Sequence, residues 1–398
     1  MSQQKMSRDL WLLIIFGAFR TISDLFMGTF FVSYIMHMAT NEITSISMYK
    51  LFEYTATCAG FFLFANWVKR YNKVAVFGLS MLPKIAVLLA IILLGGRAVE
   101  YVVPMGLLYG FSAAMYHLPR HAMTADKTNA RSVGCFVGTK NAIGYLVKII
   151  APVILGCFID TGSYSDVAFV LLLFTFVELG LVFFLSPSRH SSSDKIDFIG
   201  FYHCMMRFPV VRRMFLMEIL RGFGLGLLGT VITMYTVYIF HTDLNLGILT
   251  TVFSLCSVAT CWALRYIHQN MTYRIILMVC ILLVFLSMSL FVHNTTPVSF
   301  LIYNFIYATA IVFLDQINNI GIYKLSRSRC ITNNTRIEYF VFRDFALFIG
   351  RWIGFTGLMY IGVFGGYAWL RWYLVLISMA LILWGGANRI LFKRVDKK

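Results

Sequence analysis

The chain is poor in charge for its length. Asp, Glu, Lys and Arg make up 13% of its 398 residues, against roughly 25% in an average soluble domain. Too few polar side chains are present to cover a folded globule, which excludes an ordinary soluble protein. Because 59% of the residues are hydrophobic, the composition favours a protein that is solvated by lipid.

Motifs for catalysis and cofactor binding are also scarce. The chain has no Walker A motif, so we expect no direct use of ATP. Its eight Cys show no C-x-x-C spacing, so we expect neither a zinc site nor a disulfide, and no other cofactor. His121 and Asp126 have the H-x-x-x-x-D spacing of some acyltransferases, but this short pattern straddles a predicted helix end. We therefore expect no enzyme.

The net charge of +17 does not indicate nucleic-acid binding, because its distribution follows a membrane topology. Most Lys and Arg fall in alternate loops and in the two tails, whereas Lys50, Arg97 and Arg371 belong to the opposite side. Such alternation is the positive-inside pattern. It predicts that both termini are cytoplasmic, in a multi-pass protein of the cell membrane.

Twelve apolar segments are long enough to span a bilayer as helices, which takes about 20 residues each. The sequence therefore predicts an all-α integral membrane protein with twelve transmembrane helices. The segments are 10–36, 46–68, 74–95, 100–121, 134–159, 165–186, 213–240, 246–267, 273–293, 297–324, 338–364 and 367–392.

The longest polar break lies between the sixth and seventh segments and divides the chain into two six-helix halves. We predict an N-terminal bundle at 1–187, a basic cytoplasmic linker at 188–212 and a C-terminal bundle at 213–398. Ser191, Ser192 and Ser193 favour a flexible centre in the linker.

The halves share a sequence pattern. Arg20 precedes Gly28-Thr29 by eight residues, and Arg221 precedes Gly229-Thr230 by eight residues, 201 positions later. A second match, at an offset of 203, relates two basic pairs, Lys140 with Lys148 and Arg343 with Arg351. Parallel six-helix repeats are typical of transporters.

At this point the chain resembles the major facilitator superfamily over its full length. The stretch Asp126–Gly134 resembles the loop between helices 4 and 5 of that family, and Gly144, Pro152 and Gly156 resemble its glycine- and proline-rich helix 5. The resemblance implies two pseudo-symmetric six-helix bundles, with helices 1, 4, 7 and 10 around a central cavity. We expect a monomer.

The loop between helices 2 and 3 departs from that pattern. The family usually carries G-x-x-x-D-R-x-G-R/K there, whereas this chain has Lys69 at the aspartate position and lacks both glycines. This difference separates the chain from the best-known drug and sugar branches, without bearing on the fold.

Ionisable side chains inside predicted helices are costly in lipid and therefore face a partner, water or a substrate. Arg20 and Asp24 share a face of helix 1 at i,i+4 spacing, and Glu218 and Arg221 share a face of helix 7 at i,i+3 spacing. In one interpretation, each pair forms a local salt bridge that allows its helix to insert into the membrane. The other is a cavity site in which Arg20 and Arg221 bind substrate while Asp24 and Glu218 carry protons. Arginines at similar depth in helices 1 and 7 are also the layout of organophosphate/phosphate antiporters.

Helix 4 ends in a second basic cluster of His117, Arg120 and His121, which share a face. It is either a basic helix end near the interface or an anion and proton site, since His titrates near neutral pH and Arg binds oxyanions with a planar fork. Asp315 in helix 10 is a further candidate for substrate binding, or a counter-ion for a buried Arg.

Five other intramembrane charges have a structural interpretation, in which basic residues of helices 5 and 11 pair with neighbouring carboxylates. The candidate carboxylates are Glu53, Glu178 and Asp344. The five charges are Lys140, Lys148, Arg343, Asp344 and Arg351.

These patterns predict a secondary active transporter that works by alternating access, for a small anionic or acidic solute and with proton coupling. The excess of intramembrane base over acid favours an anion. Alternatives are a flippase of lipid-linked glycans, multidrug efflux and a non-transporting membrane sensor. The flippase is suggested by Met217–Gly222, which resembles the helix 1 segment of the lipoteichoic-acid glycolipid flippase.

Overall fold

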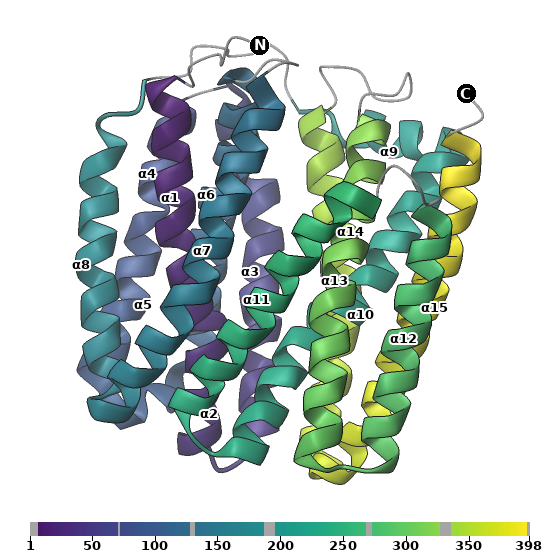
Figure 1. Cartoon of the computed structure of the whole chain (residues 1–398). Helices are drawn as coiled ribbons and strands as arrows, with labels where there is room; N and C mark the ends of the chain where they lie inside the picture. Colours follow the sequence, from purple (N-terminus) through teal and green to yellow (C-terminus); the bar gives the residue numbers. More distant parts are fainter. Residues whose placement is uncertain are drawn as a thin grey trace. The chain divides into compact units, whose positions relative to one another are not determined.

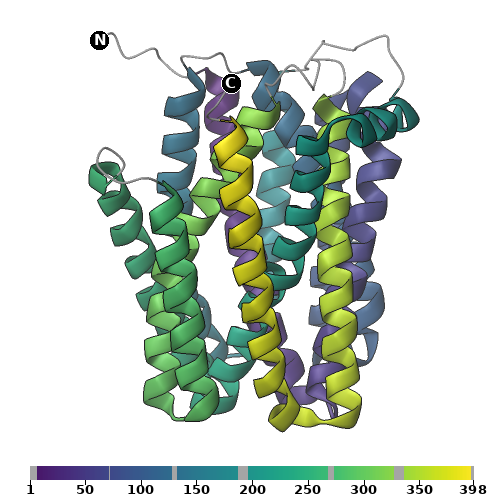
Figure 2. The ribbon, with the colours of Figure 1, turned by 90° about the vertical axis from the view of Figure 1, so that its right-hand side faces the viewer.

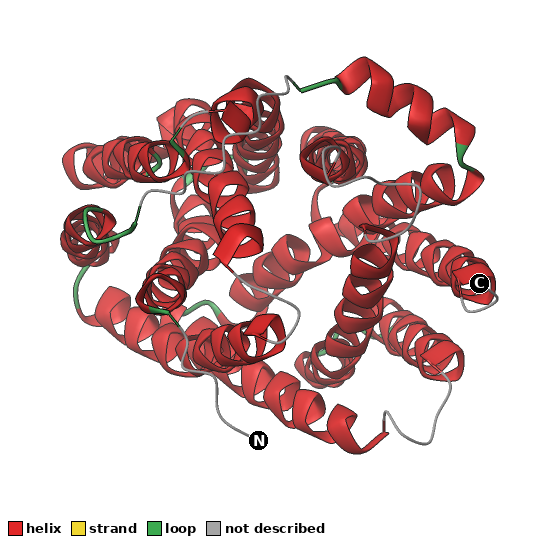
Figure 3. Cartoon of the chain, turned by 90° about the horizontal axis from the view of Figure 1, so that it is seen from above, coloured by secondary structure: helices red, strands yellow, loops and turns green. Residues whose placement is uncertain are grey.

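The computed structural model consists of helices joined by short connections, and its described part contains no strand (Figure 3). Long apolar runs fold this way because a helix satisfies its own backbone hydrogen bonds, which lipid cannot do. The described residues are 7–70, 72–127, 132–186, 196–267, 273–326 and 336–395.

Contacts divide the chain into two compact units. The first comprises Met1–Ile196 and Phe240–Thr251, and the second comprises Asp197–Ile239 and Val252–Lys398. The helices before residue 196 are α1 (Arg8–Leu25), η1 (Phe26–Phe30), α2 (Phe31–Met38), α3 (Glu42–Arg70), α4 (Lys73–Leu79), α5 (Met81–Leu94), η2 (Gly95–Tyr101), α6 (Val102–Lys127), α7 (Ser132–Thr161) and α8 (Tyr164–Val182) (Figure 1). The later helices are α9 (Phe198–Arg207), α10 (Pro209–Phe240), α11 (Asp243–Ile267), α12 (Tyr273–His293), α13 (Pro297–Ser326), α14 (Arg336–Phe364) and α15 (Gly366–Val395).

The predicted all-α, twelve-helix membrane fold is confirmed. Nine stretches of described residues are long and apolar enough to cross a membrane, and one of them, Lys73–Thr124, is 52 residues long and holds two successive crossings. The remaining crossings are α12, whose apolar part is shorter, and α3, which carries Lys50 and Glu53 in its first half.

The predicted linker, 188–212, contains helix that the sequence analysis did not expect. It includes α9 and the start of α10, which begins at Pro209. Figure 2 shows α9, in teal, running across the helix ends of the second unit rather than along them. Phe198 and Phe201 account for this helix, because both rings pack against Phe342 of α14. The domain boundaries 1–187 and 213–398 stay a prediction.

Glycines bring helix backbones into contact in both units. A Cβ on Gly110 of α6 would lie 2.1 Å from the Glu53 carbonyl oxygen of α3, and one on Gly350 of α14 would lie 2.0 Å from the Ile219 carbonyl oxygen of α10. No side chain fits at either separation. These contacts fix the helix pairs that carry the polar residues described below.

The first membrane crossing contains a π-helical turn. η1 follows α1 directly, and its five residues separate α1 from α2. In the second unit, by contrast, α10 is an unbroken α-helix of 32 residues. π-turns occur mostly at functional sites, and this one begins two residues after Asp24.

Candidate functional site

A cavity of about 450 Å³ lies within the first unit, between α1, α6 and α7. Its wall is formed by Gly17, Thr21, Asp24 and Leu25 of α1, by His117 and Arg120 of α6, and by Lys140, Asn141, Gly144, Tyr145 and Lys148 of α7. Two glycines in this wall widen the space. At Gly17 and Gly144, an added Cβ would meet nothing within 4 Å. These glycines therefore leave room that the protein does not fill.

The cavity wall carries more positive than negative charge. Arg120, Lys140 and Lys148 all line it, and none of the three has a carboxylate within ion-pair distance among the described residues. Arg120 and Lys148 both repel Lys140 electrostatically. Like charges held around one space in a low-dielectric protein favour the entry of an anion.

Asp24 is the one carboxylate among the described residues of the wall, and Arg20 and Tyr109 hold it in place. Its Oδ1 lies 2.8 Å from Arg20 Nε and accepts a hydrogen bond of 2.6 Å from the Tyr109 hydroxyl. The Asp24 side chain is 43% exposed, while that of Arg20 is 4% exposed. Asp24 therefore reaches the cavity, and Arg20 lies behind it.

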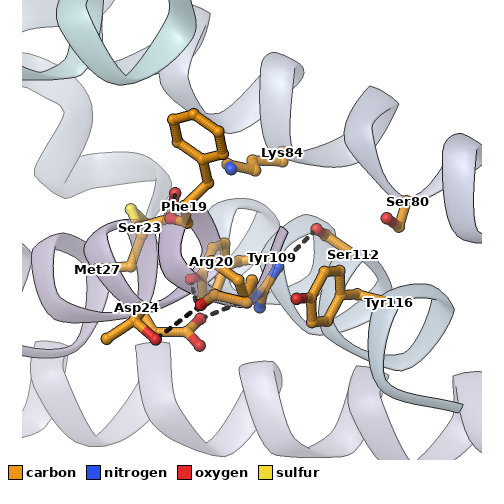
Figure 4. A network of polar contacts seen from close by, with 12 residues as sticks. Phe19, Arg20, Ser23, Asp24, Met27, Ser80, Lys84, Tyr109, Ser112 and Tyr116 are labelled. Atoms are coloured by element: carbon orange, nitrogen blue, oxygen red, sulfur yellow. Dashed lines mark hydrogen bonds and ion pairs between the residues drawn. The ribbon is translucent and has the colours of Figure 1, made fainter. Parts of the chain in front are cut away.

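Arg20 is surrounded by polar and aromatic groups of α6 (Figure 4). Its Nη1 donates to Ser112 Oγ at 3.1 Å, and its guanidinium lies 4.8 Å from the ring centre of Tyr109 and 5.2 Å from that of Tyr116. The i,i+4 pairing expected of Arg20 and Asp24 is present. The arginine does not line the cavity, however, so its geometry supports the local salt bridge rather than direct contact with a solute.

The basic cluster at the end of α6 is divided by the fold. His117 and Arg120 line the cavity, whereas His121 is exposed and does not. The Arg120 guanidinium lies 5.2 Å from the Tyr116 ring centre, and its Nη1 donates to the Tyr116 hydroxyl at 3.4 Å. The same aromatic ring therefore orients both Arg20 and Arg120.

The structural interpretation of Lys140 and Lys148 stays a prediction. Both residues face the cavity instead of a carboxylate. Two of the three carboxylates proposed as partners pair with other lysines, because Glu53 Oε2 lies 2.8 Å from Lys50 Nζ and Glu178 Oε1 lies 2.8 Å from Lys84 Nζ.

The Lys84–Glu178 pair is a feature that sequence reasoning missed. It joins α5 to α8, and its side chains are only 2% and 1% exposed. Lys84 is drawn in Figure 4 near Phe19. The available signal was a lysine directly after Pro83 inside an apolar segment, but nothing local identifies a partner 94 residues away.

A second missed cluster surrounds Asp243, the first residue of α11. Asp243 is 5% exposed, and its Oδ2 accepts a hydrogen bond of 2.5 Å from the Tyr164 hydroxyl and lies 3.9 Å from His37 Nε2. The next residue, Leu244, donates its backbone N–H to Asp160 of α7 at 3.3 Å. These contacts fasten the first turn of α11 to the first unit.

In the second unit, Glu218 of α10 is 1% exposed and lies between two arginines. Its Oε2 is 3.4 Å from Arg221 Nη1 and 3.6 Å from Arg343 Nε. The predicted pairing of Glu218 with Arg221 is therefore present. Asp344 is half-buried on α14 and is attracted electrostatically by Arg343 and by Arg351.

Two further predictions about site residues stay predictions. Asp315 belongs to α13, but its side chain lies outside the described residues. Arg20 and Arg221 belong to different units, so their meeting across a central cavity stays a prediction.

Comparison with known proteins supports the architecture. No protein-family model matches the sequence. A protein described as "Uncharacterized protein in sodM 3'region", from Geobacillus stearothermophilus, is 23% identical over 159 residues, which cover 40% of this chain and 74% of that protein. The crystal structure of the human organic anion transporter MFSD10 (TETRAN) superposes with a TM-score of 0.65 at 12% identity, covering 97% of this chain and all of the other. The chain thus has the major facilitator fold and is a multi-pass membrane protein.

Proposed function

Proceeding from the major facilitator fold, we propose that the protein is a secondary active transporter, rather than an enzyme, for a small anionic solute. It works by alternating access, with the cavity of the first unit as part of the solute site. The observation that carries this proposal is the set of three cations, Arg120, Lys140 and Lys148, around one cavity without carboxylate partners among the described residues. The function of the human structural neighbour, an organic anion transporter by its description, agrees with it.

Electrostatics explain why an anion would bind here. Two unit charges about 8 Å apart at an effective dielectric constant of about 20 repel by roughly 2 kcal/mol. Three such cations in one cavity raise the free energy of the empty site, and an anion between them removes that repulsion. Arg120 supplies a planar donor fork, and the two lysines supply mobile point charges.

Proton coupling would proceed through Asp24. This carboxylate faces the cavity, yet it is held by Arg20 and Tyr109. An anion that enters beside Arg120 competes with Asp24 for the positive field of the site. The Asp24 carboxylate, which is then less stabilised by the surrounding positive charge, takes up a proton. Solute and proton therefore cross together.

The test is anion uptake into proteoliposomes that contain the purified protein. Lys140→Gln and Lys148→Gln each remove one cavity cation, and we expect each to lower uptake at sub-saturating solute by about tenfold, the equivalent of roughly 1.4 kcal/mol. Arg97→Gln is the matched control, because it removes an exposed cation outside the cavity wall. Normal uptake by both lysine variants would refute the anion site.

A steric variant tests the same cavity without changing its charge. Gly144→Leu places a side chain where the protein leaves open space, and leucine is a better helix former than glycine. The variant should therefore fold and yet block uptake. Gly180→Leu is its control, since Gly180 of α8 also has open space around its Cβ position but does not line the cavity. Unimpaired uptake by Gly144→Leu would place the solute elsewhere.

We also propose that both termini are cytoplasmic and that the protein lies in the plasma membrane, as the distribution of Lys and Arg favours. Single cysteines at Asn41, Ser163 and Thr295, all exposed, should react with an impermeant thiol reagent added to intact cells. A cysteine at Asn72 should react only after the membrane is permeabilised. The opposite pattern would reverse the orientation.

A further inference from the structure

Resting on the proposed function, we propose that the solute of this cavity carries at least two negative charges, as a phosphate monoester or a dicarboxylate does. The basis is the charge balance of the wall and the spacing of its cations. A monovalent anion would satisfy only part of this site.

The charge balance leaves three cations for the solute. Asp24, the one carboxylate among the described residues of the wall, is neutralised by Arg20, whose Nε is 2.8 Å away. Arg120, Lys140 and Lys148 remain, and none has a carboxylate partner among the described residues. One negative charge would leave two of these cations uncompensated and repelling each other. Two or three negative charges compensate most of the excess.

The spacing of the cations divides the wall into two positive regions. Lys140 and Lys148 lie on one stripe of α7, eight residues apart, which corresponds to about 12 Å along the helix axis. Arg120 repels Lys140, as Lys148 does. Gly144 lies between the lysines on this stripe and leaves the intervening space open. The space admits an anion whose charge is spread over several oxygens or over two groups.

The remaining polar groups of the wall fit the uncharged part of such a solute. Asn141 and Tyr145 lie on α7 beside the lysines, and Thr21 lies on α1 opposite them. The Asn141 amide can donate and accept hydrogen bonds, and the Thr21 hydroxyl, which donates to the Gly17 carbonyl oxygen at 2.8 Å, can accept one. This suits a solute that carries hydroxyl groups as well as charge. Both a soluble metabolite and the headgroup of a lipid present this chemistry.

Two pairs of probes of matched shape test the inference on the purified, full-length protein. The first pair is glycerol 3-phosphate, with close to two charges at pH 7.5, and its methyl phosphodiester, with one. The second pair is succinate and its monoamide, succinamate. Binding is measured by thermal shift over a range of ligand concentrations, since a ligand that binds the folded protein raises its stability by RT ln(1 + L/Kd), where L is the free ligand concentration. We expect at least one doubly charged probe to bind about tenfold more tightly than its singly charged match, a factor set by one added charge contact.

The lysines should account for that preference. In Lys148→Gln the ratio between the two members of the pair should fall by about threefold or more, while Arg97→Gln should keep it. To test a lipid as the source of the headgroup, the same comparison is made between lysophosphatidate and its methyl phosphodiester, both presented in nanodiscs. A preference that is found only there supports the same multivalent site with a lipid as its source.

Equal binding within every pair, or binding of no member of any pair in solution or in lipid, would overturn the inference. Equal binding of singly and doubly charged anions would leave the proposed anion transporter intact. The proposed function fails separately, if uptake of anions into proteoliposomes does not depend on Lys140 and Lys148.

Discussion

Removal of Lys84 should destabilise the protein far more than removal of an exposed cation. Lys84 and Glu178 form an ion pair of 2.8 Å whose side chains are 2% and 1% exposed. The second carboxylate oxygen of Glu178, Oε2, is buried and has no hydrogen-bond partner among the described residues. In Lys84→Met, which keeps the volume and apolar stem of the lysine, Glu178 stays in place without its counter-charge.

Breaking a buried ion pair by removing one partner costs about 3–5 kcal/mol, because the remaining charge is buried and uncompensated. Arg20 attracts Glu178 from a greater distance, so we expect a loss of about 3 kcal/mol, at the lower end of that range. Replacement of both partners, as Lys84→Met with Glu178→Leu, should recover most of the loss, because apolar residues of similar volume often replace a buried pair without cost.

The assay is a double-mutant cycle on the free energy of unfolding, measured by denaturant titration in one detergent. Arg97→Met serves as the control, since Arg97 is exposed, and it should change stability by less than about 0.5 kcal/mol. The reasoning is refuted if Lys84→Met is as stable as the native protein, or if the double variant is no more stable than the single one.

Three further changes have defined outcomes. Gly110→Ala should lower stability by about 1–3 kcal/mol through overpacking, since its Cβ would lie 2.1 Å from the main chain of α3; a native melting temperature would contradict this. Asp24→Asn should abolish uphill uptake driven by a pH gradient while sparing exchange down a solute gradient, and pH-independent transport by the native protein would remove proton coupling. Tyr109→Phe removes the hydroxyl that donates to Asp24, so it should shift the pH profile of uptake. Tyr303→Phe, which removes a buried hydroxyl without a partner among the described residues, should leave that profile unchanged.

The helices could be predicted from the sequence, because length and apolarity decide membrane insertion locally. The pair of Arg20 with Asp24 was also predictable, because residues four positions apart share one face of a helix. Which of the two faces the cavity was not, since Arg20 is held by Tyr109 and Ser112, about 90 residues further along the chain. Only the packing of α6 against α1 brings these groups together.

The π-helical turn limits what the internal repeat can predict. Arg20 and Gly28 have the same spacing as Arg221 and Gly229, but η1 begins at Phe26 in the first case and α10 is unbroken in the second. A π-turn inserts one extra residue, which rotates the following side chains by about 100°. Equal spacing in the two halves therefore does not give equal directions, and no feature of the repeat itself reveals this.

The attachment of α11 to α7 has a mechanical consequence. The first residues of α11 approach α7 so closely that a Cβ on Gly247 would lie 2.4 Å from the Pro152 carbonyl oxygen, and Thr251 donates its hydroxyl to the Ile149 carbonyl oxygen at 2.8 Å. From Val252 onward, the same helix belongs to the second unit. α11 thus has its first residues packed against α7 in the first unit and its remaining residues in the second unit. In the proposed transport cycle, a movement between the two units would therefore act on α11 near Val252 and on its contacts with α7.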